Sequence, residues 1–598
     1  MIIALYMTDY AMPPEWVAEM KRWICHVQNK DGGWGLHTQG ASNVNATVLY
    51  YVSLRILGVP ASYDVAVRAR QCLKDLGSAA LAPQWARHWL ATLNLYKWEG
   101  VQPVPSEMWS LPEWLPIHPW RWWIHARVVY LPVSFLYANK CQMPLNDLLL
   151  QLREEIYEQP YDTIDFSSFL HCVAPADNRR PINKILSIVN YTMRIWESYL
   201  RPSWIHEQAN ARVRELIRCE DENTSYNDLA PVNKAFQLVA VHFADGADRK
   251  AVQLHHEKIL PYFWVSKFGM NCGGTNGVQV WDVEFSVLGI AEAGLGRDPQ
   301  FRDVLEKAHQ FLDRSQFRDD VNHPHRQRRK GGWPFSTKDN GYSVSDCTAE
   351  GLKAILVLQE ELGFEKIVST DRLYDCVDTL INMQNPDKGF GSYEQTRATE
   401  LLEFINPSEI FQRCMVEYSY PECTSAVVMA LKKFHKHYPS YSADKIDAAV
   451  QAASTYLHGA QEPDGSWYGS WGICYTYGTM FALEGLAAAG QTYATSDAVR
   501  RGCQFLVEKQ KNDGGWGERW QSCEHHKYIE HKQSQVVQTA WAVLGLMAAR
   551  YPDKALVARG LELIRGRQLP NGEWLQEDIE GIFNGTWSVV NEYGTFDW

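Results

Sequence analysis

Two carboxylic acids stand four residues apart in Ser345-Asp-Cys-Thr-Ala-Glu350, at the start of an apolar stretch that runs to about Leu362. Because positions i and i+4 share one face of a helix, Asp346 and Glu350 are expected to lie close together. Repulsion between two carboxylates and burial in apolar surroundings both raise a carboxyl pKa. The arrangement can therefore keep a protonated carboxylic acid available at neutral pH, as proton-initiated chemistry requires.

Cysteines accompany this acid pair. Cys347 follows the first acid directly, and a second Cys-Thr pair, in Glu422-Cys-Thr-Ser425, opens a similar apolar stretch further along the chain. The same residue types are also ordinary polar caps at helix N-termini. Chemistry alone leaves the two interpretations, an acid site and a pair of helix caps, about equally open.

The elements that must position these residues are helices separated by a recurrent turn of the form Gln, a few residues, then Gly-X-aromatic. Its copies are Gln28–Trp34, Gln316–Trp333, Gln384–Phe390, Gln461–Trp467, Gln510–Trp516 and Gln568–Trp574. Each copy follows an amphipathic helical pattern and most precede a second, apolar one, with almost no strand pattern. The sequence thus predicts an all-α array of helix pairs, in which the turns tie outer helices together.

In a closed α/α barrel the inner helices run parallel, so their N-termini share one rim. The helices expected to begin near Asp346, Cys423 and Cys474 would then meet at one mouth. Residues 1–270 differ in composition, with many Trp and Pro residues around Trp109–Trp123 and fewer clear repeats. We place a domain join near the glycine turn Gly273–Gly277, which gives one domain over 1–270 and a second over 271–598.

Bulk composition limits the class of protein. The chain has 598 residues, 24 Trp, 13 Cys and a formal net charge of −12, which argues against nucleic acid as the main partner. Irregularly spaced cysteines without a secretory leader indicate reduced thiols in a cytosol-facing protein. No apolar run reaches the eighteen or so residues that a spanning helix needs. A soluble or monotopic protein is the expectation.

Several of these motifs together resemble the oxidosqualene cyclases. The resemblance rests on Asp346-Cys-Thr-Ala-Glu350, on the preceding Lys330-Gly-Gly-Trp-Pro-Phe-Ser-Thr337, and on Val416-Glu-Tyr-Ser-Tyr-Pro-Glu-Cys-Thr-Ser425. It extends from the first residues to about Thr586. Bacterial squalene–hopene cyclases carry an Asp-rich motif in place of Cys-Thr, so this variant implies an epoxide substrate.

The resemblance implies two α/α barrels with a catalytic cavity between them, and an isomerase activity. The expected reaction is proton-initiated cyclisation of (3S)-2,3-oxidosqualene to a tetracyclic triterpene, with lanosterol as the default product and a protostadienol-type skeleton as the alternative. Asp346 is then the acid, Cys347 and Cys423 are its hydrogen-bond donors, and Glu350 helps to restore its proton. No cofactor and no metal are expected.

The resemblance also assigns the end of the cascade and the cavity wall. The family pairs a histidine, here His125, with a tyrosine, here Tyr393, to accept or direct the final proton. Aromatic residues that line the family's cavity match Trp123, Trp281, Phe335, Trp471 and Tyr477. Taken singly, each of these residues is more often a packed core side chain. Together they make sense because an aromatic face stabilises a cation without offering a nucleophile.

Partners and completeness follow from the same resemblance. An apolar substrate implies docking on one membrane leaflet as a monotopic protein, with the endoplasmic reticulum or lipid droplets as the expected location. The chain starts inside the family's first barrel and ends in an irregular tail, Trp587–Trp598, in place of the family's closing helix. A cyclase truncated at both ends should be poorly stable and nearly inactive, because water would reach and quench the cations.

Other readings of the sequence remain open. Arg326–Lys330 is either a basic recognition patch or, more in keeping with its place in an insertion, a solvated loop. Four possible zinc ligands, at spacings that match no standard template, are Cys523, His525, His526 and His531. An α/α-barrel glycoside hydrolase would also be acidic, Trp-rich and built on paired carboxylates, but would turn over a soluble sugar. A non-catalytic remnant would bind lipid without turnover.

Overall fold

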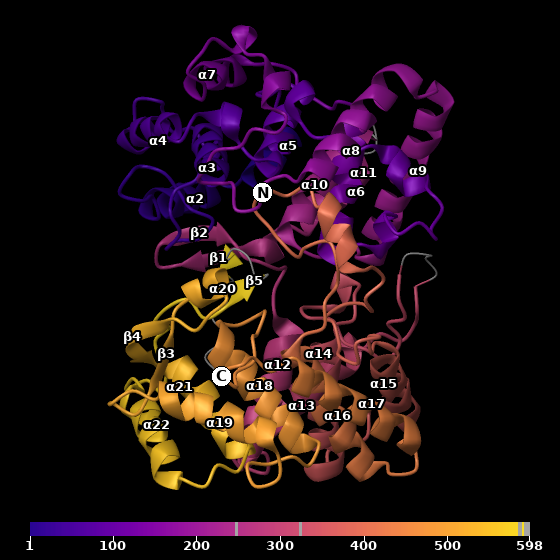
Figure 1. Ribbon diagram of the computed structural model, residues 1–598, viewed down its shortest axis with the longest axis vertical. Helices are drawn as coiled ribbons and strands as arrows, with labels where there is room; N and C mark the ends of the chain where they lie inside the picture. The colour runs from indigo at the N-terminus through magenta and orange to yellow at the C-terminus, as the bar shows by residue number, and fades with distance from the viewer. Residues whose placement is uncertain (245–248, 322–325, 584–588, 591–598) are drawn as a thin grey trace. The chain divides into compact units, whose positions relative to one another are not determined.

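The computed structural model describes residues 1–244, 249–321, 326–583 and 589–590 (Figure 1). The chain forms two compact units: residues 1–276 with 398–416, and residues 277–397 with 417–598. Within the described residues, strands occur only as three short antiparallel pairs, so the all-α prediction is confirmed. The predicted tail Trp587–Trp598 lies outside the described residues apart from 589–590. The expected cavity between two domains stays a prediction.

The first unit is a ring of helices with others outside it. Its helices are α1 Ile2–Met7, α2 Pro14–His26, α3 Val44–Ile56, α4 Asp64–Asp75, α5 Gln84–Thr92, α6 Ile124–Ala138, α7 Asp147–Glu155, α8 Lys184–Ile195, α9 Ser203–Asn223, α10 Pro231–Ala244 and α11 Arg249–Glu257. A hairpin, β1 Phe263–Ser266 and β2 Gly269–Cys272, follows them. Helices α1, α3, α5, α6 and α10 pack in succession, and α10 returns to α1.

The second unit alternates inner and outer helices. Its helices are α12 Gln279–Glu292, α13 Pro299–Ser315, α14 Ser345–Leu356, α15 Thr370–Asn382, α16 Pro421–His437, α17 Ala443–Gly459, α18 Cys474–Ala488, α19 Asp497–Lys509, α20 Gln521–His525, α21 Val536–Ala548 and α22 Lys554–Gly566. Its strand pairs are β3 Trp516–Glu518 with β4 Glu530–Gln535, and β5 Ile582–Phe583 with β6 Val589–Val590. Helices α12, α14, α16, α18 and α21 pack one against the next, each with an outer partner among α13, α15, α17, α19 and α22.

The Gln-Trp turns hold these helices together through backbone carbonyls. In one copy, the Gln461 amide donates to Gly465 O at 2.9 Å and to Ala498 O of the next outer helix at 2.9 Å. The indole of the same turn, on Trp467, donates to Leu457 O at 2.7 Å. The copies at Gln28, Gln384 and Gln510 bridge to the next outer helix in the same way. The indole bond to Leu457 O satisfies a carbonyl in the last turn of α17, and the glutamine bonds tie each turn to the next outer helix.

A threonine in the first turns of helices α3, α14, α16, α18 and α21 binds the turn that precedes the helix. The backbone N–H of Trp333 donates to Thr348 Oγ1 at 3.0 Å, and that of Phe390 donates to Thr424 Oγ1 at 3.0 Å. The same bond recurs at Trp34–Thr47, Trp467–Thr479 and Trp516–Thr539. The threonines of the two Cys-Thr pairs are therefore structural, and they place the residues just before them at the inner-helix N-termini.

Candidate active site

The first turn of α14 carries the predicted acid. Ser345 fixes this turn, because its N–H donates to Ser392 O at 2.7 Å and its hydroxyl donates to Gly391 O at 2.6 Å. The residues around the acid on α14 are buried, whereas Asp346 itself is half-buried. The helix ends as expected near Leu362, although its last turn, Val357–Glu361, widens into a π-helix.

The Asp346 carboxylate accepts two hydrogen bonds. Oδ1 accepts the backbone N–H of Cys347 at 2.8 Å, and Oδ2 accepts the thiol of Cys423 from the first turn of α16 at 3.6 Å. Burial raises the Asp346 pKa above its ordinary value, and these donors lower it in part. Burial likewise raises the pKa of both thiols well above the usual range, so Cys347 and Cys423 are neutral donors.

The second acid of the pair has its own cation. Glu350 is buried, and its Oε2 lies 2.7 Å from Lys353 Nζ on the same helix. Burial raises the Glu350 pKa, Lys353 lowers it, and the nearby charge of Asp346 raises it further. The two carboxyl groups on this helix face therefore interact electrostatically, as the spacing predicts. Burial, however, raises the Glu350 pKa more than their mutual repulsion does.

Two buried carboxyl groups near this turn were missed by the sequence interpretation. Both oxygens of Glu284 on α12 lack a hydrogen-bond partner within the described chain, and Oε1 occupies space that a Cβ at Gly351 would need. Burial raises its pKa well above the ordinary value, and Glu350 and Asp346 raise it further. Burial also raises the pKa of Glu422 to about 7. Glu284 stands in no motif, and Glu422 stands in the Glu422–Ser425 motif but was given no role there; their proximity to Asp346 in space marks both.

The aromatic residues form separate contacts in the two units. In the second unit, Trp281 and Phe335 have ring centroids 5.6 Å apart. Tyr477 lies 4.9 Å from Trp541 between ring centroids, and Trp471 Nε1 donates to Ser392 Oγ at 3.1 Å. The structure thus connects Trp471 with the acid turn, because Ser392 also lies 3.4 Å from the Cys423 sulfur.

The proposed terminal base belongs to the first unit. His125 lies in the first turn of α6, with its ring centroid 4.5 Å from that of Trp123. Burial lowers the His125 pKa to about 3, so the imidazole is neutral at physiological pH. Tyr393 is buried in the second unit, next to Ser392 in the chain.

The four possible zinc ligands, Cys523, His525, His526 and His531, form no group with metal-ligand geometry among the described residues. The one group there with metal-ligand geometry is Asp221, Asp228 and His255 in the first unit, all buried. The ammonium of Lys234 already lies 3.6 Å from Asp228 Oδ2 and 2.9 Å from His255 Nδ1. A side-chain cation therefore occupies the place that an ion would take, and the group is best described as an internal ion network.

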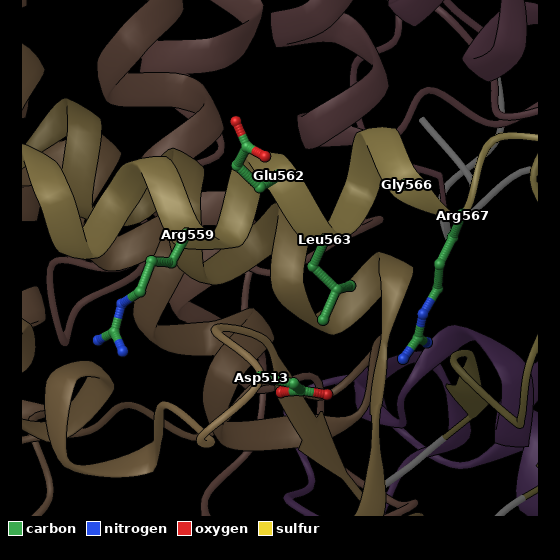
Figure 2. Close-up of a pocket in the computed structure, with 6 residues that line it drawn as sticks. All are labelled: Asp513, Arg559, Glu562, Leu563, Gly566 and Arg567. Atoms are coloured by element: carbon green, nitrogen blue, oxygen red, sulfur yellow. The ribbon is translucent and has the colours of Figure 1, made fainter.

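A surface groove on α22 is unrelated to the acid. Figure 2 shows its lining residues, among them Arg559, Arg567 and Asp513. Asp513 accepts the N–H of Gly515 at 3.1 Å and the hydroxyl of Ser534 at 2.6 Å, and Arg559 donates to the glutamine of the same turn at 2.6 Å. These groups support a Gln-Trp turn.

Comparison with known proteins identifies the family. Family models described as the squalene-hopene cyclase N-terminal and C-terminal domains match residues 1–254 and 278–590. Lanosterol synthase erg7A of Aspergillus fumigatus is 48% identical, over 100% of this chain and 80% of the relative. Lanosterol synthase ERG7 of Saccharomyces cerevisiae is 42% identical, over 99% of this chain and 82% of the relative. Terpene cyclase/mutase ntnI of a Nectria species is also 42% identical, over 99% and 82%. The chain therefore belongs to the family of squalene–hopene cyclases and lanosterol synthases, the triterpene-forming terpene cyclases.

Proposed function

We propose that this protein is an oxidosqualene cyclase, an isomerase that converts (3S)-2,3-oxidosqualene to lanosterol or a related tetracyclic triterpene. The observation that carries the proposal is the half-buried Asp346, whose carboxylate accepts the Cys347 N–H and the Cys423 thiol. Burial keeps this acid protonated at higher pH than usual, and the two donors are ready for the charge that appears when it loses its proton.

The reaction begins with proton transfer. Neutral Asp346 gives its proton to the epoxide oxygen, the carbon–oxygen bond breaks, and the nearest alkene supplies the electron pair that closes the first ring. The transferred proton remains as that of the product hydroxyl. A hydrogen-bond donor binds an ionised carboxylate more strongly than a neutral carboxyl group and therefore favours the ionised state. The Cys423 thiol and the Cys347 N–H thus lower the barrier to proton transfer from Asp346.

Aromatic faces then stabilise the moving positive charge. Trp281, Phe335, Trp471 and Tyr477 in the second unit, with Trp123 in the first, are the rings that we assign to this role. A ring face attracts a cation by about 0.5–2 kcal/mol, depending on how dry the site is, and cannot capture it covalently. Indoles and phenols suit this purpose better than carboxylates, which would end the cascade early.

The cascade ends when a carbon-bound proton is lost. His125 is suited to accept it, because burial keeps its imidazole neutral, and we assign Tyr393 as its partner on the basis of family resemblance. One proton enters at oxygen and one leaves from carbon, so the product is an isomer of the substrate. Asp346 must then be reprotonated, and we assign this step to Glu350, whose ion pair with Lys353 reaches towards solvent.

The same substrate calls for contact with a membrane. None of the described helices combines the length and apolar character that crossing a bilayer requires. We propose docking on one leaflet through the α8 surface, defined by the exposed residues Ile185, Ile188, Tyr191, Ile195, Tyr199, Leu200 and Trp204. Tyr199 is 83% and Trp204 64% exposed, and such amphipathic aromatics favour the boundary between headgroups and acyl chains. The endoplasmic reticulum or lipid droplets are the membranes that we propose.

A protostadienol-type product is the second candidate. Similarity favours lanosterol, since the lanosterol synthase erg7A is 48% identical and ntnI, a terpene cyclase/mutase, is 42% identical; the protostadienol-type skeleton stays the alternative. Expression of the chain in membranes of a host without its own cyclase, fed oxidosqualene and read by mass spectrometry, tests both. A tetracyclic alcohol that depends on Asp346 supports the proposal, whereas substrate binding without any turnover supports the non-catalytic alternative.

A further inference from the structure

Four side chains of the second unit form a continuous chain of hydrogen bonds. Trp471 Nε1 lies 3.1 Å from Ser392 Oγ, Ser392 Oγ lies 3.4 Å from Cys423 Sγ, and Cys423 Sγ lies 3.6 Å from Asp346 Oδ2. Ser392 and Cys423 are fully buried, so water does not compete for these bonds. The chain joins an indole assigned to cation stabilisation with the carboxyl group assigned to initiation.

Chemistry fixes the direction of every bond once Asp346 has lost its proton. A carboxylate can only accept, so the single thiol proton of Cys423 points at Oδ2. An indole N–H can only donate, so the Ser392 oxygen accepts from Trp471. The hydroxyl proton of Ser392 is then available to the sulfur of Cys423, which has become an acceptor. All three donors therefore point towards Asp346.

We propose that Ser392 and the indole N–H of Trp471 are positioning residues for the initiating acid, which act through Cys423. Successive donors polarise one another, so the chain makes the weak thiol a better donor when the carboxylate forms. No proton is transferred along it. Trp471 then has two separable tasks: its ring face meets a cation, and its N–H supports the acid. This inference rests on the proposed function.

Backbone hydrogen bonds hold the Ser392 and Trp471 segments of this hydrogen-bond chain in place. The carbonyl of Ser392 accepts the N–H of Ser345, the residue before the acid, at 2.7 Å, and its N–H donates to Glu417 Oε1 at 3.0 Å. At the other end, Glu422 Oε1 accepts the N–H of Ser470 at 2.7 Å and of Trp471 at 3.1 Å. These buried carboxyl groups fix loops that otherwise carry no regular structure.

The test separates the donor from the ring. Trp471→Phe keeps an aromatic face and removes the N–H, and Ser392→Ala breaks the chain while leaving every ring intact. We expect turnover of oxidosqualene to fall about three- to tenfold in both variants, with an upward shift of the alkaline limb of the pH–rate profile. The product profile should stay as in wild type, in contrast to Trp471→Ala. Ser454→Ala is the matched control, since its buried hydroxyl donates to Val450 O on α17.

A second measurement does not depend on turnover. The carbonyl band of protonated Asp346, obtained as the infrared difference between each protein and its Asp346→Asn counterpart, gives the acid's pKa directly. A higher pKa in Ser392→Ala and Trp471→Phe, and not in Ser454→Ala, supports the inference even if the wild-type chain proves inactive on oxidosqualene. An unchanged pKa and an unchanged alkaline limb in both variants would overturn it while leaving the role of Asp346 intact.

Discussion

Replacement of Asp346 by Asn separates the chemistry of the acid from its contribution to the fold. The side-chain oxygen of Asn can still accept the Cys347 N–H that Asp346 Oδ1 accepts at 2.8 Å, and its volume is nearly the same. An amide, however, has no acidic proton for an epoxide. We therefore expect Asp346→Asn to lose cyclisation while the protein remains folded.

The size of the activity loss follows from the role. An acid that initiates the cascade should be worth at least about 2.7 kcal/mol of barrier, which is roughly a hundredfold in rate. The free energy of unfolding, in contrast to the activity, should not fall in Asp346→Asn. The folded pKa of Asp346 is raised, so the folded state holds a proton that the unfolded state releases, and stability falls as pH rises through the folded pKa. The uncharged Asn avoids that loss.

The assay combines product mass spectrometry with thermal unfolding at pH 6 and pH 8. We expect less than about 1% of wild-type product, and a Tm that is not lower than that of wild type at either pH and does not fall relative to it from pH 6 to pH 8. Turnover above that level would remove Asp346 from the initiating role. A Tm well below wild type at both values would mean that the activity loss reports unfolding.

Other variants test the remaining assignments. His125→Ala should change the products more than substrate binding, and an unchanged profile at normal rate would make the residue structural. Trp471→Ala should divert the cascade to earlier-quenched products, since a lost ring face costs about 1–2 kcal/mol, and identical products would limit Trp471 to packing. Glu284→Met should raise stability by about 1–3 kcal/mol, increasingly so at higher pH, because a buried unpartnered carboxyl with a raised pKa is replaced; denaturant unfolding measures it. Ile188→Ser with Trp204→Ser should reduce flotation with lipid vesicles, while the paired exposed changes Val304→Ser and Leu561→Ser should not.

Local patterns predicted much of the fold. The repeated Gln and Gly-X-Trp spacing indicates helix pairs, and the amide of Gln461 joins its own turn to the next outer helix, as that interpretation requires. The role of Thr348 was not foreseen, since a threonine after a cysteine at a helix start also fits an ordinary cap. Only the bond from the Trp333 N–H to its hydroxyl shows that it registers the turn against the next helix.

The candidate site was predictable where it is local in sequence. Asp346 and Cys347 are neighbours, and their motif stands out. Ser392 has no such signal, and Glu422, although it stands in the second Cys-Thr motif, shows no role there, because the importance of both comes from the residues that long-range folding places against them. Glu284 was missed for a related reason: within an apolar helical pattern a single acid suggests a solvated position, whereas packing of α12 against α14 buries it.

The threonine register also explains how one repeat yields both an acid and its support. The residue two positions before each registering threonine occupies an equivalent place in its repeat: Asn45, Asp346, Glu422, Tyr477 and Val537. Two neighbouring repeats carry a carboxyl there. Glu422 uses its own to hold the backbone of Trp471, and Asp346 is left with a thiol and one N–H, which is a weaker set of donors. Burial raises the pKa of both carboxyls, that of Glu422 to about 7, so the hydrogen bonds alone do not decide which of the two is the acid. The repeat places a structural anchor and a proton donor at the same position, and the groups that contact each carboxyl distinguish the two roles.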